Sequence, residues 1–172
     1  TQGVGVVSGV FKKDDGKRIV QILDVKNIFK LQNVPKDANR NRLGRELLGR
    51  KRGNRKQCIS FVVGPAKCAL AISDIHEILK ISKLSDSALG IGHCIGTIDL
   101  RGTTVPVVDF ASLLNYREVD RSEAATQGDR RVLVMRLEKE LFGLIVDSVD
   151  SIVSYFPDEL IAFPVVEQSR GD

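Results

Sequence analysis

The chain of 172 residues is poor in several residue types and has no long apolar run. A membrane-spanning helix needs about 18 or more consecutive apolar residues, and no stretch approaches that length, so membrane insertion is not expected. Residues 1–9 lack the basic start and the apolar core of a signal peptide. Because the chain starts with Thr1 and not with Met, we expect a fragment or a processed product.

Cysteine is scarce: Cys58, Cys68 and Cys94 are too few and too irregularly spaced for a disulfide framework. Each lies in an apolar, strand-like run, where a free cysteine behaves as a small buried hydrophobe. This usage predicts a reducing, cytoplasmic setting. His93 and Cys94 could converge with another cysteine, but no Cys-x-x-Cys or His-x-x-x-His spacing is present, so no metal site is expected.

Histidine is scarcer still, with His76 and His93 alone. No Gly-x-Ser-x-Gly turn and no glycine-rich phosphate loop occurs in the chain. A nucleophile activated by a histidine base would have to use one of these two residues. The sequence therefore predicts a protein that is not an enzyme and that binds no cofactor.

The positive charge belongs to one segment. Residues 36–56 hold nine Lys or Arg and two acidic residues, whereas the remainder has 17 basic and 20 acidic residues. The segment has no sustained apolar period and is interpreted as an exposed basic linker over residues 35–56. Nine cations could also bind nucleic acid or an anionic surface, but no aromatic residue is interleaved for base stacking, so no nucleic acid partner is expected.

Short apolar runs separated by turn residues predict a mostly β protein. The expected strands are residues 4–11, 18–23, 57–63, 68–72, 94–100, 105–110, 132–137 and 141–146. Short helices are expected after Asp24 and over residues 111–114, and a further one with Ile75, Ile78 and Leu79 on one face, capped by Ser73 or Asp74. Many short strands with few helices indicate small β-barrels and exclude a Rossmann-type fold.

One sequence pattern occurs twice. Residues 20–24 (Val-Gln-Ile-Leu-Asp) followed by Ile28 and Phe29 match residues 105–109 (Val-Pro-Val-Val-Asp) followed by Leu113 and Leu114. Each copy follows a strand that begins with glycine, Gly9 or Gly96, and a polar turn. Two similar subdomains are therefore expected, each with an Asp that ends a strand and caps a short helix.

Several motifs, in this order, resemble the family of CheW-like chemotaxis coupling proteins. They are Cys58-Ile-Ser-Phe-Val-Val, Ile75-His-Glu-Ile, Asp99-Leu-Arg-Gly, Pro106-Val-Val-Asp and Phe142-Gly-Leu-Ile-Val-Asp-Ser-Val. The resemblance covers about residues 57–166. It implies two small SH3-like, five-stranded β-barrel subdomains with short helices.

The order of the segments departs from that of the family. Members end with a Gly-Val-x-Lys hairpin and an Ile-Leu-Asp strand before a short helix, and this chain has such a segment at its start, over residues 8–24. We therefore expect a piece of a tandem CheW protein, in which residues 1–34 close one domain and residues 57–172 open the next. Residues 1–34 are predicted to complete the barrel of residues 57–172, within the chain or by exchange between chains.

The resemblance also implies a function without catalysis. One barrel face would bind the CheW-like regulatory domain of a CheA-type histidine kinase, and a groove between the barrels would meet the cytoplasmic tip of a chemoreceptor. Self-association through barrel contacts could extend a receptor array. The expected partner-binding residues are Ile75, Glu77, Ile95, Arg101, Gly102, Val146, Asp147 and Val149.

Purely structural interpretations of these residues, and other classes of function, stay open. The Glu77–Arg101 pair could be a weak surface salt bridge, and several of the apolar residues could belong to the core. Gly102 could be required only for the backbone conformation of the turn. Asp147 could be a cap or a surface contact. The chain could also be the regulatory part of a longer CheA-type kinase, or, in another class, bind nucleic acid or an anionic surface through residues 36–56.

Overall fold

The computed structural model describes residues 5–31, 54–81, 84–85, 93–116 and 128–162. The basic segment 36–53 lies outside the described residues. The strands are β1 Val7–Lys13, β2 Arg18–Leu23, β3 Lys56–Val63, β4 Ala66–Ala71, β5 Ile75–Lys80, β6 Cys94–Leu100, β7 Thr103–Asp109, β8 Arg131–Leu137, β9 Glu140–Val146 and β10 Ser148–Tyr155. The helices are α1 Val25–Leu31, α2 Phe110–Leu113 and two 3-10 turns, η1 Ile72–Asp74 and η3 Pro157–Glu159.

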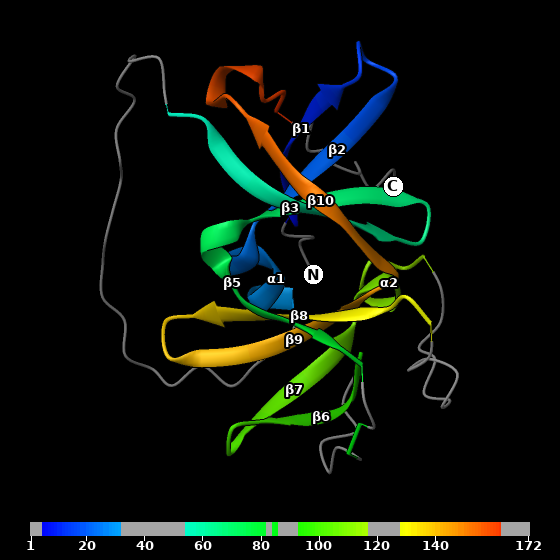
Figure 1. The fold of residues 1–172 in the computed structure, drawn as a ribbon, viewed down its shortest axis with the longest axis vertical. Helices are drawn as coiled ribbons and strands as arrows, with labels where there is room; N and C mark the ends of the chain where they lie inside the picture. The colour runs from blue at the N-terminus through cyan, green and yellow to red at the C-terminus, as the bar shows by residue number, and fades with distance from the viewer. Residues whose placement is uncertain (1–4, 32–53, 82–83, 86–92, 117–127, 163–172) are drawn as a thin grey trace, which may run out of the picture.

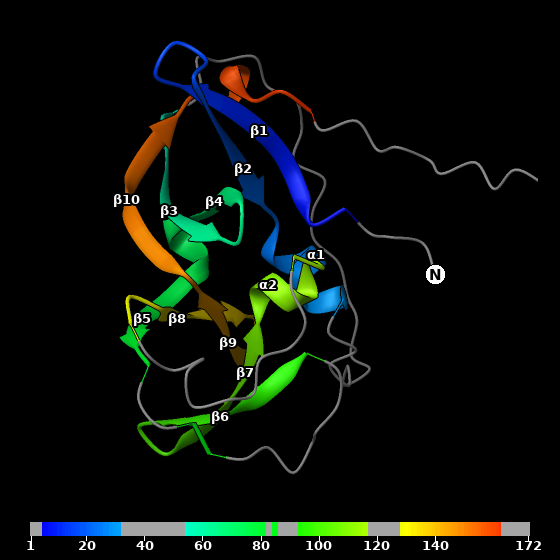
Figure 2. The same cartoon turned by 90° about the vertical axis from the view of Figure 1, so that its right-hand side faces the viewer.

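The strands form two five-stranded sheets. The first, with the order β1-β2-β4-β3-β10, is called the first barrel below, and the second, with the order β5-β8-β9-β7-β6, the second barrel. In Figures 1 and 2 the first lies above the second, with α1 and α2 at the level between them. The expected mostly β fold of two five-stranded subdomains is confirmed.

The two barrels repeat one plan, as the doubled sequence pattern predicts. In each, the second strand of a hairpin pairs in parallel with another strand: β2 with β4, and β7 with β9. Each of these strands leads through an Asp into a short helix. The Asp24 carboxylate accepts from the Lys26 N–H at 2.8 Å, and the Asp109 carboxylate accepts from two N–H groups of α2. Both aspartates are helix caps, as expected.

Each barrel is closed by a segment that follows an edge strand. After β10, Ile161 exchanges two backbone hydrogen bonds of 2.9 and 2.8 Å with Val10 of β1. After β5, Ser85 exchanges two of 2.9 Å with Thr97 of β6. Gly9 and Gly96 stand beside these bridges, each at an irregularity in its strand.

Close approach explains the two glycines. A Cβ at Gly9 would lie 2.6 Å from Leu160 Cγ, and one at Gly96 would lie 2.8 Å from the Ser85 carbonyl oxygen. Because neither distance leaves room for a side chain, glycine lets the closing segment reach the edge strand.

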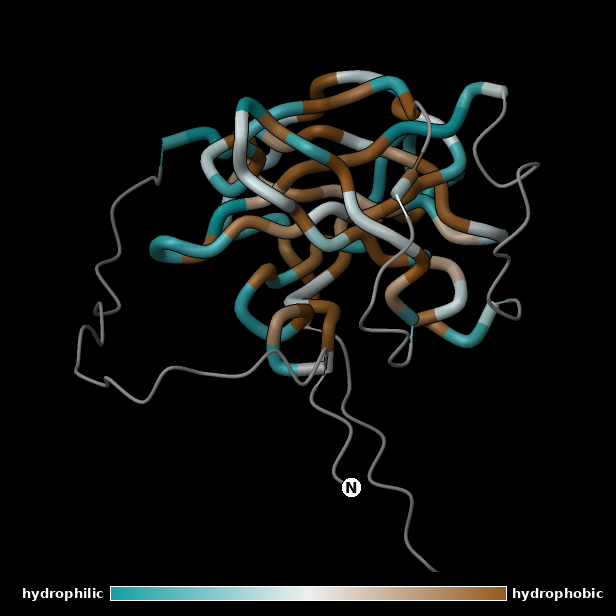
Figure 3. Tube along the Cα trace, turned by 90° about the horizontal axis from the view of Figure 1, so that it is seen from below, coloured by the Kyte–Doolittle hydropathy of each residue, from teal (hydrophilic) through white to brown (hydrophobic). Residues whose placement is uncertain are grey.

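Apolar side chains form three clusters. One lies within the first barrel and includes Phe11, Val20 and Tyr155. Another lies within the second barrel and includes Val107 and Val132. The largest, here called the central core, combines side chains of both barrels and both helices; it includes Leu23, Val25, Ile28, Phe29, Phe61, Val63, Leu70, Phe110, Leu133, Met135, Phe142, Leu144 and Val146. Figure 3 shows most of the apolar stretches, in brown, in the middle of the molecule and most of the polar stretches, in teal, toward its outer loops.

The N-terminal segment contributes to the central core through α1. Ile28 and Phe29 are buried, as expected from the sequence, and the Phe29 ring meets the Phe142 ring of β9 edge to face, at 84°. Aromatic pairs favour this arrangement because the positive ring edge meets the negative face. Side chains of residues 5–31 therefore pack against the second barrel as well as the first.

The expected helix over residues 75–79 is wrong. Residues 75–80 form strand β5, which pairs antiparallel with β8, and their burial alternates from residue to residue. His76 therefore lies on a strand, with its side chain exposed. Apolar residues at 75, 78 and 79 fit one helical face, whereas the strand places Ile78 on its exposed face and Glu77 on its half-buried face, so hydrophobicity does not follow the two-residue period. The cap assigned to Ser73 or Asp74 is replaced by the three-residue turn η1.

Candidate docking site

The candidate site is built on the turn that joins β6 to β7. Leu100 pairs with Thr103, so the turn consists of Arg101 and Gly102, whose φ angles are 52° and 84°. Two positive φ angles are typical of the type I′ hairpin, whose twist matches that of the flanking strands. The Asp99 carboxylate accepts from the Gly102 N–H at 3.1 Å. Nothing lies within 4 Å of the place of a Gly102 Cβ, so backbone conformation alone accounts for this glycine.

This turn presents Arg101 to solvent. The Arg101 Nη2 lies 3.4 Å from Glu77 Oε1 of β5, and the side chains are 76% and 29% exposed. The contact joins edge strand β5 to the β6–β7 turn. An ion pair this exposed contributes about 0–1 kcal/mol to stability. Most of the guanidinium's five N–H donors therefore stay open to a partner.

The apolar residues of the expected groove do not gather in one place. Ile75 and Val149 are half-buried against the central core, whereas Ile95 packs against the core of the second barrel. Val146 has no exposed surface and belongs to the central core, so it cannot touch a partner on the folded chain. Of the four expected apolar residues, Ile75 and Val149 are the ones that are partly exposed and pack against the core shared by both barrels.

Asp147 holds the two barrels together. Its carboxylate accepts from the Gly64 N–H of the β3–β4 turn at 2.7 Å and lies 3.7 Å from Arg130 Nε. Its own N–H donates to the Val62 carbonyl at 2.9 Å. A short, charge-assisted hydrogen bond to a backbone N–H is among the stronger kinds. Asp147 is therefore a structural link between the end of β9 and the first barrel.

Sequence reasoning missed the residues around Gly64. A Cβ at Gly64 would lie 3.1 Å from the Tyr116 Cβ, so the Tyr116 side chain packs on this turn. Partial burial raises the pKa of the Tyr116 hydroxyl, which is hydrogen-bonded to Gln21. Nearby, Lys67 Nζ of β4 lies 2.6 Å from Asp150 Oδ2 of β10. A turn at Gly64 fits the short gap between the expected strands 57–63 and 68–72, but its partner Asp147 lies 83 positions further along the chain.

The two histidines do not form a catalytic set in the described part of the chain. His93 Nδ1 lies 3.1 Å from Ser112 Oγ, and that hydroxyl donates to the Asp109 carbonyl at 2.8 Å, so the serine serves the local structure of α2. His76 lies on the opposite edge strand. Within the described ranges, no group of three His, Cys, Asp or Glu side chains is placed to hold a metal ion.

The buried cysteines are inert thiols. Burial raises the pKa of Cys58 to about 11 and that of Cys68 to about 12. A thiol is nucleophilic only as the thiolate, so both stay unreactive near neutral pH. No helix among the described residues is long and apolar enough to span a bilayer.

Asp74 of η1 gives the fold a pH dependence. Burial, followed by the nearby Asp24 carboxylate, raises the pKa of Asp74 above its ordinary value of 3.8. The folded chain then binds a proton at a higher pH than the unfolded chain does, so this group lowers stability above the raised pKa and ceases to do so below 3.8.

The Asp74→Asn variant removes that cost. We expect a higher urea midpoint than wild type at pH 7, with the difference vanishing as the pH falls below 3.8. Unfolding curves across this pH range measure it. Asp150→Asn is the matched control, because it removes the negative charge that pairs with Lys67 and should lower the midpoint at pH 7. A midpoint for Asp74→Asn below wild type at pH 7 would contradict the argument.

The structure thus defines a class of protein: two five-stranded β-barrels joined by a shared core, with an exposed arginine on a tight turn. The chain belongs to the family of CheW-like domains, whose model matches residues 57–169. The described residues 5–31, which supply β1, β2 and α1, lie outside that match.

Three curated relatives carry chemotaxis names. The chain is 24% identical over 106 residues to the probable chemotaxis protein CheW of Rhizobium etli, covering 62% of this chain and 64% of that protein. It is 27% identical over 100 residues to chemotaxis protein CheW of Rhizobium meliloti, covering 58% and 61%. It is 23% identical over 117 residues to chemotaxis protein CheW of Bacillus subtilis, covering 68% and 72%. The chain therefore spans less than two thirds of each Rhizobium relative.

A solved structure shows the same fold. The crystal structure of the scaffolding protein TtCheW from Thermoanaerobacter tengcongensis matches with a TM-score of 0.51 and 22% identity, covering 66% of this chain and 70% of that one.

Proposed function

We propose that this chain is a non-catalytic adaptor of chemotaxis-type signalling, which couples a CheA-type histidine kinase to chemoreceptors by protein–protein docking. Its membership of the CheW-like family and the chemotaxis names of its relatives support this class of function. One barrel face would bind the CheW-like regulatory domain of the kinase. The surface that carries Ile75, Glu77 and Arg101 would meet the receptor tip.

The exposed Arg101–Glu77 contact is the observation that carries the proposal. Arg101 is held by a turn of fixed shape, because Gly102 adopts a positive φ and its N–H is bound by Asp99. The turn fixes the position of the Arg101 backbone, and the planar guanidinium loses less entropy per hydrogen bond formed than a flexible ammonium group does. At the equivalent turn of the first barrel, residues 14–17, the arginine makes a local contact instead, since Arg18 pairs with Asp14 at 3.0 Å.

Arg101→Ala tests this proposal directly. We expect it to weaken binding to a purified receptor cytoplasmic tip or kinase regulatory domain from the same organism roughly tenfold, the effect of truncating a central interface arginine. Isothermal titration calorimetry measures the change. The melting temperature should stay near that of wild type, because the ion pair is exposed.

Arg18→Ala is the matched control. It also removes one exposed arginine from a hairpin and breaks one ion pair with a carboxylate, so it alters net charge and local structure equally. We expect it to leave both affinities unchanged. Equal losses for the two variants would mean that general charge, and not the Arg101 turn, governs binding, and the proposed site would be wrong.

We also propose that residues 1–34 complete the barrel of residues 57–172, within one chain or by exchange between two. The pairing of β2 with β4 and the packing of α1 in the central core support this arrangement. Without residues 1–34, strand β4 would have an unpaired edge, and the central core would expose an apolar face to solvent.

Deletion of residues 1–34 is expected to unfold or aggregate the remaining chain, as circular dichroism and light scattering would show. For the intact chain, size-exclusion with light scattering distinguishes the two routes, because closure within the chain gives a monomer and exchange gives a dimer. A truncated chain with the urea midpoint of the intact protein would rule the proposal out.

A further inference from the structure

The β8–β9 turn is the structural counterpart of the β3–β4 turn. Both turns contain two residues, Gly64-Pro65 and Glu138-Lys139, and their first residues have φ angles of 54° and 56°. The strands reach the turns in the same register, through the pairs Ser60↔Ala69 and Val63↔Ala66 in one barrel and Val134↔Gly143 and Leu137↔Glu140 in the other. The N–H groups of Gly64 and Glu138 therefore occupy equivalent places and point in equivalent directions.

In the first barrel this N–H binds a carboxylate. Gly64 N donates to Asp147 Oδ2 at 2.7 Å, and Asp147 follows Gly143 by four residues. For the turn of the second barrel the corresponding residue would follow β4, four positions after Ala69; it is Ser73, which is hydrogen-bonded to Asp74 instead. Among the described residues, nothing accepts from the Glu138 N–H.

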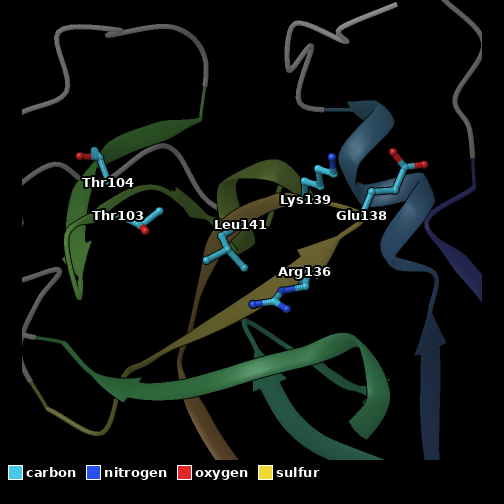
Figure 4. A pocket seen from close by; sticks show the side chains of 6 residues that line it. All are labelled: Thr103, Thr104, Arg136, Glu138, Lys139 and Leu141. Atoms are coloured by element: carbon cyan, nitrogen blue, oxygen red, sulfur yellow. The ribbon is translucent and has the colours of Figure 1, made fainter. Parts of the chain in front are cut away.

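The second turn instead borders a pocket of about 390 Å³. The parallel strands β7 and β9 pair from Val107 and Gly143 onward, so their first residues are not paired with each other and leave this space open. Its lining residues are Thr103, Thr104, Arg136, Glu138, Lys139 and Leu141. Figure 4 shows the two threonines on one side and the β8–β9 turn on the other, with Leu141 between them.

The lining suits an anion. Arg136 and Lys139 supply two positive charges against the single carboxylate of Glu138, and no ion pair uses either cation in the ranges that the structure describes. Figure 4 shows the Glu138 side chain on the side away from the threonines. The threonine hydroxyls add donors, and Leu141 gives an apolar surface for the stem of an acidic side chain.

We propose that this pocket is a second docking site, which binds a carboxylate side chain of an acidic peptide segment on a partner protein. The Glu138 N–H takes the role that the Gly64 N–H has toward Asp147, while Arg136 and Lys139 pair with the charge. The lining residues include neither Arg101 nor Glu77, although Thr103 follows the Arg101-Gly102 turn directly. The proposal does not depend on the function proposed for that turn.

Amide chemical shifts of the ¹⁵N-labelled full chain test the site at low ionic strength. The probe is a capped Gly-Asp-Glu-Asp-Gly peptide, and the matched peptide is Gly-Asn-Gln-Asn-Gly. We expect the acidic peptide to move the Glu138 amide proton downfield, with changes confined to the pocket, and the neutral peptide to leave it unchanged. The Gly64 amide proton, already bonded to Asp147, should stay in place.

Two variants move the affinity in opposite directions. Arg136→Gln with Lys139→Gln should weaken peptide binding roughly fivefold or more, and Glu138→Gln should strengthen it, because one removes attraction and the other repulsion. Lys12→Gln with Lys80→Gln removes the same charge from exposed strand positions outside the pocket and should change nothing.

Three results would overturn the inference. They are shifts spread evenly over the surface lysines and arginines, unchanged binding in both pocket variants, and a Glu138 amide that responds to inorganic phosphate but not to the acidic peptide. Loss of the adaptor function, with these shifts intact, would leave the pocket assignment standing.

Discussion

Phe29→Ala is expected to lower the free energy of unfolding by about 3–5 kcal/mol, the range for truncation of a buried phenylalanine. Phe29 is 6% exposed and meets Phe142 of the second barrel edge to face. The variant removes apolar contact between the N-terminal segment and β9 and leaves a cavity in the central core. Equilibrium urea unfolding, followed by circular dichroism, measures the loss.

Phe156→Ala is the matched control for this prediction. Phe156 is 42% exposed, and its ring is covered by the Arg55 guanidinium at 5.6 Å. Removal of such an exposed ring should cost less than about 1 kcal/mol. If Phe29→Ala cost no more than Phe156→Ala, α1 would not be packed in the central core in solution.

Gly143→Ala is expected to destabilise the chain by about 1–3 kcal/mol through overpacking. A Cβ at Gly143 would lie 2.6 Å from Val132 Cγ1 and 3.3 Å from Val107 Cγ2, in the closed core of the second barrel. The equivalent residue of the first barrel is Ala69, which is fully buried. This position of the barrel can therefore hold a methyl group when the surrounding side chains leave room for it.

A double-mutant cycle isolates this contact. Val132→Ala removes the methyl group nearest to the new Cβ, so Gly143→Ala with Val132→Ala should be more stable than the sum of the single losses predicts, by at least about 0.5 kcal/mol. Urea unfolding of the four proteins gives the coupling energy. Strict additivity would show that the clash with Val132 is not the cause.

Local sequence signals predicted most of the fold. Each hairpin has its turn residues next to the strands that they join, and Asp24 and Asp109 stand next to the helices that they cap, so short windows contain the needed information. Strand β5 was missed because its apolar spacing fits a helix as well as an irregular strand. Its pairing with β8, more than 50 residues later, decides the conformation, and no local signal records such a pairing.

The candidate site was predicted through the family resemblance more than through residue patterns. The Glu77–Arg101 contact was expected and is present, although its role in docking stays a prediction. Val146 was assigned to a groove, but strand β9 is buried on both faces, so its apolar run carries no alternation that separates core from surface. The Gly64–Asp147 bond joins residues 83 positions apart and was invisible to sequence reasoning.

The bridges beside Gly9 and Gly96 have a consequence for solubility. A single methyl group at either position would push the closing segment off its edge strand, by contact with Leu160 in one case and with the Ser85 carbonyl in the other. The backbone groups uncovered there would then be free to template the strands of other molecules. Because neither Gly9 nor Gly96 has a side chain, both edge strands stay covered, and this helps to protect the protein from aggregation.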